Sequence, residues 1–414
     1  MLDALRNKAC ELDKTDVLAA LRERFYIPND KVYLDGNSLG VLPRAMTEGL
    51  ARLVEVEWGD DLISSWNKHN WIDLPERLGE RLAPLLGAAP GQVLCTDSIS
   101  VNVFKLLATA LALQPGRRVV LVEASDFPTD RYVADGLANL LGAQRCEVRA
   151  VAVNELVESL GTDVAVMLLS EVNYRTGRRH DKRLINNAAH AVGALTCWDV
   201  AHAAGAMPVE FDATGVDFAV GCSYKFLNGG PGAPGFLYVA KRHQNKVSQP
   251  LAGWLGHQAP FDFEPGYTPA SGVLRYQTGT PSILAMRALD IALDCFDGVT
   301  LEQLRNKSLA LSAFFIEALK TQSVFQSLRV ITPESAAERG SHVAICHEAA
   351  FALSQDLIAR GVVVDFRAPD IIRFGFAPMY NTFNNALQAL NALAQSLTDA
   401  TYRAPRFQAR AKVT

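Results

Sequence analysis

Residues 195–232 of this 414-residue chain read LTCWDVAHAAGAMPVEFDATGVDFAVGCSYKFLNGGPG. Two short runs within it, at 195–198 and 218–221, are almost entirely apolar. Each run ends in a polar signal: Asp199 follows the first, and Lys225 with a glycine-rich turn follows the second. Apolar runs bounded in this way predict buried parallel strands, so these polar residues should lie at one edge of a sheet.

The same pattern extends from about residue 90 to 240, where strand-like runs alternate with helical stretches. The other runs lie at 92–95, 118–122, 164–169 and 236–239. This alternation predicts an α/β fold with a mostly parallel sheet. Residues 240–282 are rich in glycine, proline and aromatic residues, which favours a functional loop region. After a helix at about 282–296, helices and strand pairs predict a smaller α+β domain.

The composition excludes several classes of protein. Hydrophobic residues make up 49% of the chain and the formal net charge is −4, which is incompatible with a disordered chain. A mildly acidic chain is not expected to bind nucleic acid, because phosphate binding needs a basic surface. The seven cysteines include no CxxC pair, so disulfides are not expected. We see no signal sequence and no membrane span, and expect a cytoplasmic protein.

Two glycine motifs suggest other chemistries, but their contexts argue against both. Residues 36–40 match the GxSxG motif of serine hydrolases, yet only one short strand precedes Ser38 and Pro43 follows closely. A glycine-flanked turn is the simpler interpretation. Residues 230–235 match GxGxxG, but two prolines interrupt the motif and a strand follows it. A nicotinamide dinucleotide site needs a helix there, so we favour a turn-rich loop whose backbone can approach a ligand.

A third motif, SHVAICHE at 341–348, raises the possibility of a zinc site. Its possible ligands are His342, Cys346 and His347. Alternation along a strand would place His347 on the face opposite the other two. A packed strand is therefore the better interpretation, and we expect no metal.

The polar features at the predicted strand ends together describe one site. A helix start at Thr96–Ser100 offers N–H groups and hydroxyls to an anion, and Phe127 offers a ring face. Asp199 could pair with a protonated ring nitrogen, with His202 one helical turn further on. Lys225 could act as an amine nucleophile. Capping, packing and surface exposure explain each feature singly, but together they match the needs of pyridoxal phosphate.

The chain resembles the kynureninase family over essentially its whole length. The stretches that carry the resemblance are LDGNSLG (34–40), EWGDDLISSWN (57–67), SDFPTDRY (125–132), WDVAHAAG (198–205), GCSYKFLNGGPG (221–232), GWLGH (253–257) and RFGFAPMYNTF (373–383). The aspartate and lysine motifs alone would also fit cysteine desulfurases, whereas GWLGH, FPTD and YKFLNGGPG are more specific.

The resemblance implies a pyridoxal-phosphate enzyme of the aspartate-aminotransferase fold type. A mainly seven-stranded, mostly parallel sheet flanked by helices would form the large domain at 61–295. Residues 296–414 would form a small α+β domain, and residues 1–60 would pack against it. The reaction implied is hydrolysis of L-kynurenine to anthranilate and L-alanine, in a homodimer with active sites at the subunit interface.

The resemblance also implies a role for each matched residue. Lys225 would be the Schiff-base lysine, Asp199 would hold the pyridine nitrogen, and the phenol of Tyr224 would protonate the departing Cβ. Arg373 would bind the substrate carboxylate, with Ser38 and Trp66 near its aromatic end. The cofactor-binding residues would be Ile99, Ser100, Phe127, Pro128, Thr129, Asp130, Ser170, Asp199, His202, Tyr224, Lys225, Trp254 and Thr280. Of these, Trp254 and Thr280 would come from the neighbouring subunit.

Other functions remain alternatives at this point. The chain could be another enzyme of this fold, such as a cysteine desulfurase or lyase, although Cys346 lies in a strand-like run rather than a mobile loop. A serine hydrolase acting through Ser38 and a non-catalytic protein of the same fold are two more. Trp66, Gly279 and Thr280 resemble the pattern of bacterial kynureninases that prefer kynurenine, so the resemblance implies a preference for kynurenine over its 3-hydroxy form. The pathway, either tryptophan breakdown or supply of NAD precursors, is left open.

Overall fold

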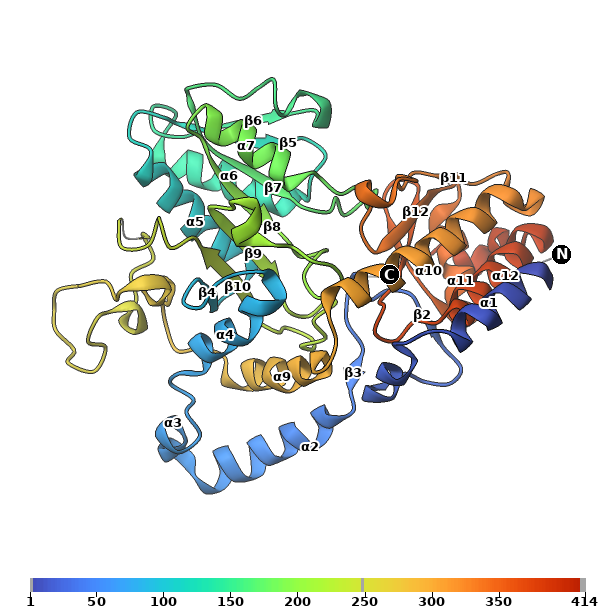
Figure 1. Ribbon diagram of the computed structural model, residues 1–414, viewed down its shortest axis with the longest axis horizontal. Coiled ribbons are helices and arrows are strands. Elements are labelled where there is room, and N and C mark those ends of the chain that lie inside the picture. The colour runs from blue at the N-terminus through green and yellow to red at the C-terminus, as the bar shows by residue number, and fades with distance from the viewer. Residues whose placement is uncertain (1–2, 247–248, 410–414) are drawn as a thin grey trace.

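The computed structural model describes residues 3–246 and 249–409, and a seven-stranded sheet forms its centre (Figure 1). The strand order is β4-β10-β9-β8-β7-β5-β6; β10 runs antiparallel to both neighbours, and the other pairs are parallel. The strands are β4 (Val93–Cys95), β5 (Val119–Glu123), β6 (Glu147–Val151), β7 (Val164–Ser170), β8 (Leu195–Asp199), β9 (Phe218–Cys222) and β10 (Gly235–Val239). The predicted mostly parallel sheet is confirmed.

One strand of this sheet, β6, was not expected from the sequence. It lies at the sheet edge beside β5, and all of its residues are only partly buried. Glu147 and Arg149 interrupt its apolar pattern. An edge strand does not need the continuous apolar run that identifies a strand covered on both faces, which is why this one was missed.

Helices cover both faces of the sheet because alternate strand residues point to opposite sides. Val120 and Val122 of β5 pack with α5 (Ile99–Leu113) and α6 (Pro128–Leu141). Val119 and Leu121 belong to the cluster on the other face. The helices that contribute to that second cluster are α4 (Leu74–Leu86), α7 (Lys182–Ala191), α8 (Phe211–Thr214) and α9 (Ile283–Leu293).

The last third of the chain forms a second layer, with helices against a four-stranded antiparallel sheet ordered β11-β12-β15-β14. Its elements are α10 (Leu301–Thr321), β11 (Arg329–Val330), β12 (His342–Cys346), α11 (Ala350–Ala359), β13 (Val362–Val363), β14 (Asp365–Arg367), β15 (Ile371–Gly375) and α12 (Phe383–Asp399). The predicted α+β arrangement is therefore present, with β13 as an additional short strand.

The N-terminal segment packs against this second layer. Helix α1 (Asp3–Lys14) lies along α12, and β2 (Val32–Tyr33) pairs with β13 in parallel. Leu5, Ala9 and Leu34 are buried in the same apolar cluster as α10 and α12. These contacts place α1 and β2 against the second layer. The packing of residues 1–60 as one unit and the domain boundaries at 60 and 295 stay predictions.

Two segments project from the layers in Figure 1. The first contains α2 (Ala45–Arg52), the π-helical turn η2 (Leu53–Asp60), η3 (Leu62–Ser64) and α3 (Ser65–Lys68). The second lies between β10 and α9, and its described residues include the short turns η5 (Trp254–Gly256) and η6 (Gly272–Tyr276). Large apolar side chains are exposed on both, among them Trp58, Ile63, Phe261 and Phe263. Such exposure on two neighbouring projections is typical of surfaces that another protein covers.

The remaining elements are short. They are η1 (Ala19–Arg24), β1 (Phe25–Tyr26) paired with β3 (Leu42–Pro43), η4 (Val153–Glu155), η7 (Asp294–Phe296), η8 (Ser323–Phe325), η9 (Ala336–Glu338), η10 (Thr401–Arg403) and η11 (Pro405–Phe407). Throughout the described ranges, none of the helices combines the length and the apolar character needed to cross a bilayer.

Candidate active site

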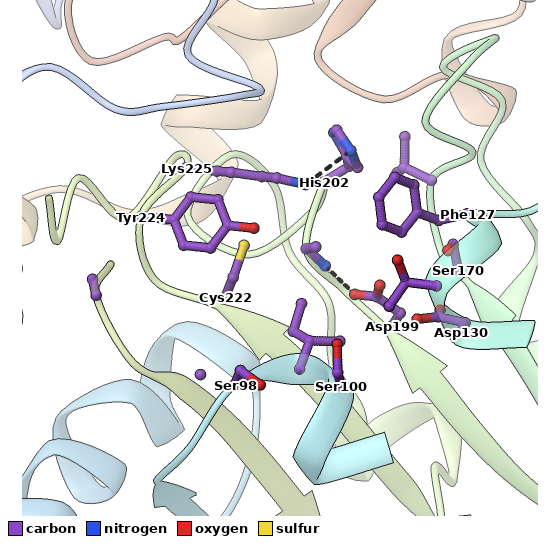
Figure 2. A pocket seen from close by; sticks show the side chains of 16 residues that line it. Ser98, Ser100, Phe127, Asp130, Ser170, Asp199, His202, Cys222, Tyr224 and Lys225 are labelled. Carbon is purple, nitrogen blue, oxygen red and sulfur yellow. Dashed lines mark hydrogen bonds between the residues drawn. The ribbon is translucent and has the colours of Figure 1, made fainter. Parts of the chain in front are cut away.

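A cavity of about 280 Å³ opens at the carboxyl ends of the central strands, where parallel α/β sheets bind ligands (Figure 2). The predicted cofactor residues that line it are Ile99, Ser100, Phe127, Thr129, Asp130, Ser170, Asp199, His202, Tyr224 and Lys225. It is also lined by Ser98, Val172, Ala201, Cys222, Ala233 and Gly235. Residues at or after the ends of β4, β5, β7, β8 and β9, and at the start of β10, thus meet at one place.

One end of the cavity is the start of α5. Ser98 caps the helix by accepting a 3.5 Å hydrogen bond from the N–H of Val101. The preceding Asp97 has a φ of +47°, a left-handed conformation that turns the chain sharply from β4 into the helix. Gly235 allows β10 to pass close by, because a Cβ there would lie 3.1 Å from the backbone nitrogen of Ile99. Free N–H groups at such a helix start attract an anion.

Two buried carboxylates lie at the opposite side of the cavity, at the ends of β8 and in the first turn of α6 (Figure 2). Asp199 Oδ1 accepts a 2.7 Å hydrogen bond from the N–H of Ala201. Both carboxylate oxygens of Asp130 are buried and have no hydrogen-bond partner among the described residues. Burial raises the pKa of Asp199 to about 6 and that of Asp130 well above its ordinary range. A ligand that donates a hydrogen bond or carries a positive charge would therefore be stabilised beside Asp130 and Asp199.

Lys225 extends from the loop after β9 toward His202, and its Nζ lies 3.0 Å from His202 Nε2 (Figure 2). Tyr224 and Cys222 flank the lysine on the same loop. Proximity to Cys222, together with burial, raises the pKa of the Tyr224 phenol. The phenol therefore keeps its proton at neutral pH and can donate it.

The lysine loop is supported by the N-terminal segment. The N–H of Gly40 donates a 2.7 Å hydrogen bond to the carbonyl of Tyr224. A Cβ at Gly40 would lie 2.3 Å from the carbonyl oxygen of Lys225, so only glycine fits this close approach. The GxSxG motif is thus a packing turn against the lysine loop.

A planar side wall is provided by Phe127, which is 42% exposed although it directly precedes α6. Its ring is held edge-on by Tyr174, with the two centroids 5.2 Å apart. Pro128 begins the helix and does not line the cavity. An exposed ring fixed in this way can stack on a flat ligand.

Arg373 lies outside the cavity lining, on β15, and is almost completely buried. Its Nε donates a 2.7 Å hydrogen bond to Asp365 Oδ1, and its Nη2 bonds to Asp365 Oδ2. Nη1 donates to the carbonyl of Tyr174 at 2.7 Å, and Nη2 also donates to Ser38 Oγ at 3.1 Å. Burial would raise the pKa of Asp365, but Arg373 outweighs it and lowers the pKa to about 2. Asp365 was not identified from the sequence, where it ends an apolar run.

The other predicted site residues lie apart from the cavity. Trp66 packs edge-on against Trp71 in the first projecting segment, 5.9 Å between centroids. Trp254 is 38% exposed and contacts Phe261 and Phe263. Thr280 is exposed ahead of α9. None of the three lines the cavity within this chain, and their roles stay a prediction.

The hydrolase and zinc alternatives gain no support from the geometry. Ser38 Oγ donates its hydrogen bond to Asp365 Oδ2 at 2.6 Å, rather than to a histidine. His342 and Cys346 are buried in β12, and no group of three or more metal-binding side chains occurs within the described parts of the chain.

Comparison with known proteins identifies relatives over the whole length. Residues 304–393 match the model of the kynureninase C-terminal domain. A kynureninase from Pseudomonas fluorescens is 44% identical, covering 99% of each chain. One from Deinococcus radiodurans is 49% identical, covering 94% of this chain and 95% of the relative.

Among solved structures, the fold is similar to that of C-DES with glycine linked to its pyridoxal-phosphate cofactor. That match has a TM-score of 0.79 at 18% identity, over 90% of this chain and 98% of the other. The cysteine desulfurase CsdA from Escherichia coli has a TM-score of 0.76 at 20% identity, over 92% and 98%. These neighbours confirm the predicted fold type.

Replacement of the buried carboxylate tests its electrostatic cost. Because the pKa of Asp199 is raised, its charge destabilises the cofactor-free protein fully above about pH 6 and not below about pH 4. We expect Asp199→Asn to raise the free energy of unfolding by roughly 1–3 kcal/mol at pH 8 and by less at pH 5. Urea unfolding of the cofactor-free protein at both pH values measures this. Equal effects at the two pH values would contradict it.

Proposed function

This chain belongs to the kynureninase family, and we propose that its cavity binds pyridoxal phosphate and hydrolyses L-kynurenine to anthranilate and L-alanine. The observation that carries the proposal is the arrangement of three ligand-binding features around one cavity. A helix start lies at one end, two buried carboxyl groups with raised pKa values at another, and a half-buried lysine faces the space between. A phosphate, a pyridinium nitrogen and an aldehyde would each find a partner there.

The residues present fit this cofactor. The start of α5 from Ser98 to Ser100 would hold the phosphate, and Phe127 would stack on the ring. Asp199 would bond to the pyridinium nitrogen, and the partnerless oxygens of Asp130 lie in the same corner. When bound, pyridoxal phosphate supplies an electron-poor ring that stabilises negative charge on the substrate carbons.

Each residue has a corresponding task in the reaction. Lys225 would hold the cofactor and, with its amine free, would take the proton from Cα. Asp199 keeps the ring nitrogen protonated. Tyr224, whose phenol retains its proton, donates to Cβ as the Cβ–Cγ bond breaks. Water supplies the hydroxyl of the anthranilate carboxyl group, which balances the hydrolysis.

Arg373 is the proposed partner of the substrate carboxylate. Asp365 fixes two edges of the guanidinium, and Tyr174 and Ser38 accept two further bonds. One N–H of Nη1 has no partner among the described residues. A carboxylate could bond to it directly, or exchange with Ser38 at Nη2.

A homodimer would complete the site. Trp254 and Thr280 do not line the cavity of their own chain, and the aromatic cluster of Trp254, Phe261 and Phe263 is exposed. A second copy placed against this loop would cover the cluster and could bring both residues to its own cavity. We also retain as proposals the domains 1–60, 61–295 and 296–414, a cytoplasmic location and a role in tryptophan catabolism. Slower hydrolysis of 3-hydroxykynurenine to 3-hydroxyanthranilate is likewise proposed.

A direct test of the function uses the purified protein and borohydride. We expect a yellow holoenzyme that loses its visible band on reduction, with the cofactor then covalently attached to Lys225 in peptide mapping. Lys225→Ala should form no such adduct and should not turn over L-kynurenine, because no other amine lies in the cavity lining. A colourless protein with a serine-directed probe attached at Ser38 would overturn the proposal.

Tyr224→Phe separates cofactor binding from proton donation. The ring is retained, so we expect normal cofactor colour but a loss of kcat of about 100-fold or more, since general acid catalysis contributes this much. Steady-state kinetics with L-kynurenine measures it. Unchanged turnover would exclude Tyr224 as the donor.

Mixing two inactive variants tests the shared site. Lys225→Ala retains Trp254 and Thr280, whereas a Trp254→Ala, Thr280→Ala double variant retains Lys225. If the sites are shared, random subunit exchange should restore about a quarter of the normal activity, because half of the dimers are mixed and each has one intact site. Recovery would be absent if each chain used its own residues.

A further inference from the structure

His342 is a buried histidine that the proposed reaction does not use. It begins β12, its side chain is fully inaccessible to solvent, and neither ring nitrogen has a hydrogen-bond partner among the described residues. A buried polar atom without a hydrogen-bond partner costs free energy, so a water molecule is expected beside it. Both polar atoms of the His342 ring therefore lack a partner among the described residues.

The ring next to His342 is that of His202. Their centroids are 5.5 Å apart, with 57° between the ring planes. His202 also has an unpartnered nitrogen, Nδ1, while its Nε2 lies 3.0 Å from Lys225 Nζ. The two adjacent rings thus carry three free nitrogens, and the fourth contacts the reactive lysine.

Both histidines are neutral in this environment. Burial, followed by the charges of Lys225 and Arg373, lowers the pKa of His202 well below its ordinary value. Burial and Arg373 lower the pKa of His342 to about 3, against the opposing effect of Asp365. The other charged group acting on both rings is Arg367. A neutral imidazole donates from one nitrogen and accepts at the other, so its tautomer decides what it offers to a neighbour.

We propose that His342 is a positioning residue that accepts a hydrogen bond from His202 Nδ1–H through one water, and so fixes the tautomer in which His202 Nε2 accepts a hydrogen bond from Lys225 Nζ. This inference rests on the proposed role of Lys225 as the base at Cα. An acceptor at Nε2 would stabilise the lysine after it takes that proton. The opposite tautomer would place two donors against each other.

The position of His342 is itself constrained by packing. A Cβ on Gly177 would lie 2.8 Å from the carbonyl oxygen of His342 and 3.3 Å from its Nε2. Gly177 has a φ of +71°, and as a glycine in the loop after β7 it allows this close contact. The four-stranded sheet thus presents a fixed ring to the lysine site of the seven-stranded sheet.

Three variants test the proposal. His342→Phe keeps a ring but removes both nitrogens, and His342→Gln keeps a hydrogen-bonding group. His347→Phe is the matched control, because His347 is also largely buried beside β12 but contacts Tyr402 instead. Each holoenzyme, labelled with ¹⁵N-histidine, is measured by NMR for the tautomer of His202, which is assigned from a His202→Gln spectrum. The pH dependence of kcat is measured in parallel.

We expect His202 to be in the Nδ1–H tautomer in the parent, in His342→Gln and in His347→Phe. In His342→Phe it should become a mixture, and the acid limb of the kcat profile should move to lower pH by about half a unit or more. An unchanged His202 tautomer in His342→Phe would overturn the proposal. A mixture of His202 tautomers in His342→Gln as well would also overturn it, because it would show that only the packing of the histidine ring matters. Absence of L-kynurenine hydrolysis in the parent would instead overturn the proposed function, which the tautomer measurement does not depend on.

Discussion

Two carboxylates buried at the same edge of a parallel sheet are the constraint on which this site depends. Asp199 ends a fully buried strand, and Asp130 has no bonded partner among the described residues. Lys225, the nearest amine of the cavity, contacts His202 rather than either acid. Burying a charge is costly, and the raised pKa values of Asp130 and Asp199 reflect that cost. A ligand that carries a positive charge or donates a hydrogen bond would therefore be stabilised at this corner. The two apolar clusters on either side of the sheet stabilise the fold and offset the free-energy cost of these buried carboxyl groups.

Around Arg373, in contrast, a buried positive charge and a buried negative charge neutralise each other. Its partner Asp365 is equally buried, and the two groups form a paired fork, so the pair can exist without a ligand. Buried ion pairs add little net stability, but they fix orientation. The region beside Ser38 is therefore set before any ligand arrives, whereas the corner of Asp130 and Asp199 is completed by one.

The sequence predicted the part of this arrangement that follows from local patterns. Apolar runs identified the buried strands, and polar residues at their ends located Phe127, Asp199 and Lys225 in one cavity. The approach of His342 to His202 had no such signal, because it depends on how two sheets pack, with the residues 140 positions apart. The edge strand β6 was missed because partial burial leaves no continuous apolar run. Trp254 and Thr280 could be matched only by resemblance, because neither follows one of the predicted strands of the sheet.

The N-terminal segment has a consequence for how the protein is made. Residues 32–40 are synthesised well before residues 361–363, yet Val32 and Leu34 donate backbone hydrogen bonds to Gly361 and Val363. Gly40, at the end of the same segment, supports the lysine loop through Tyr224. Contacts between such distant parts of a chain form late, after the intervening segments have collapsed. The lysine loop therefore reaches its final support only after residue 363 has been synthesised, and cofactor incorporation is expected to follow that point.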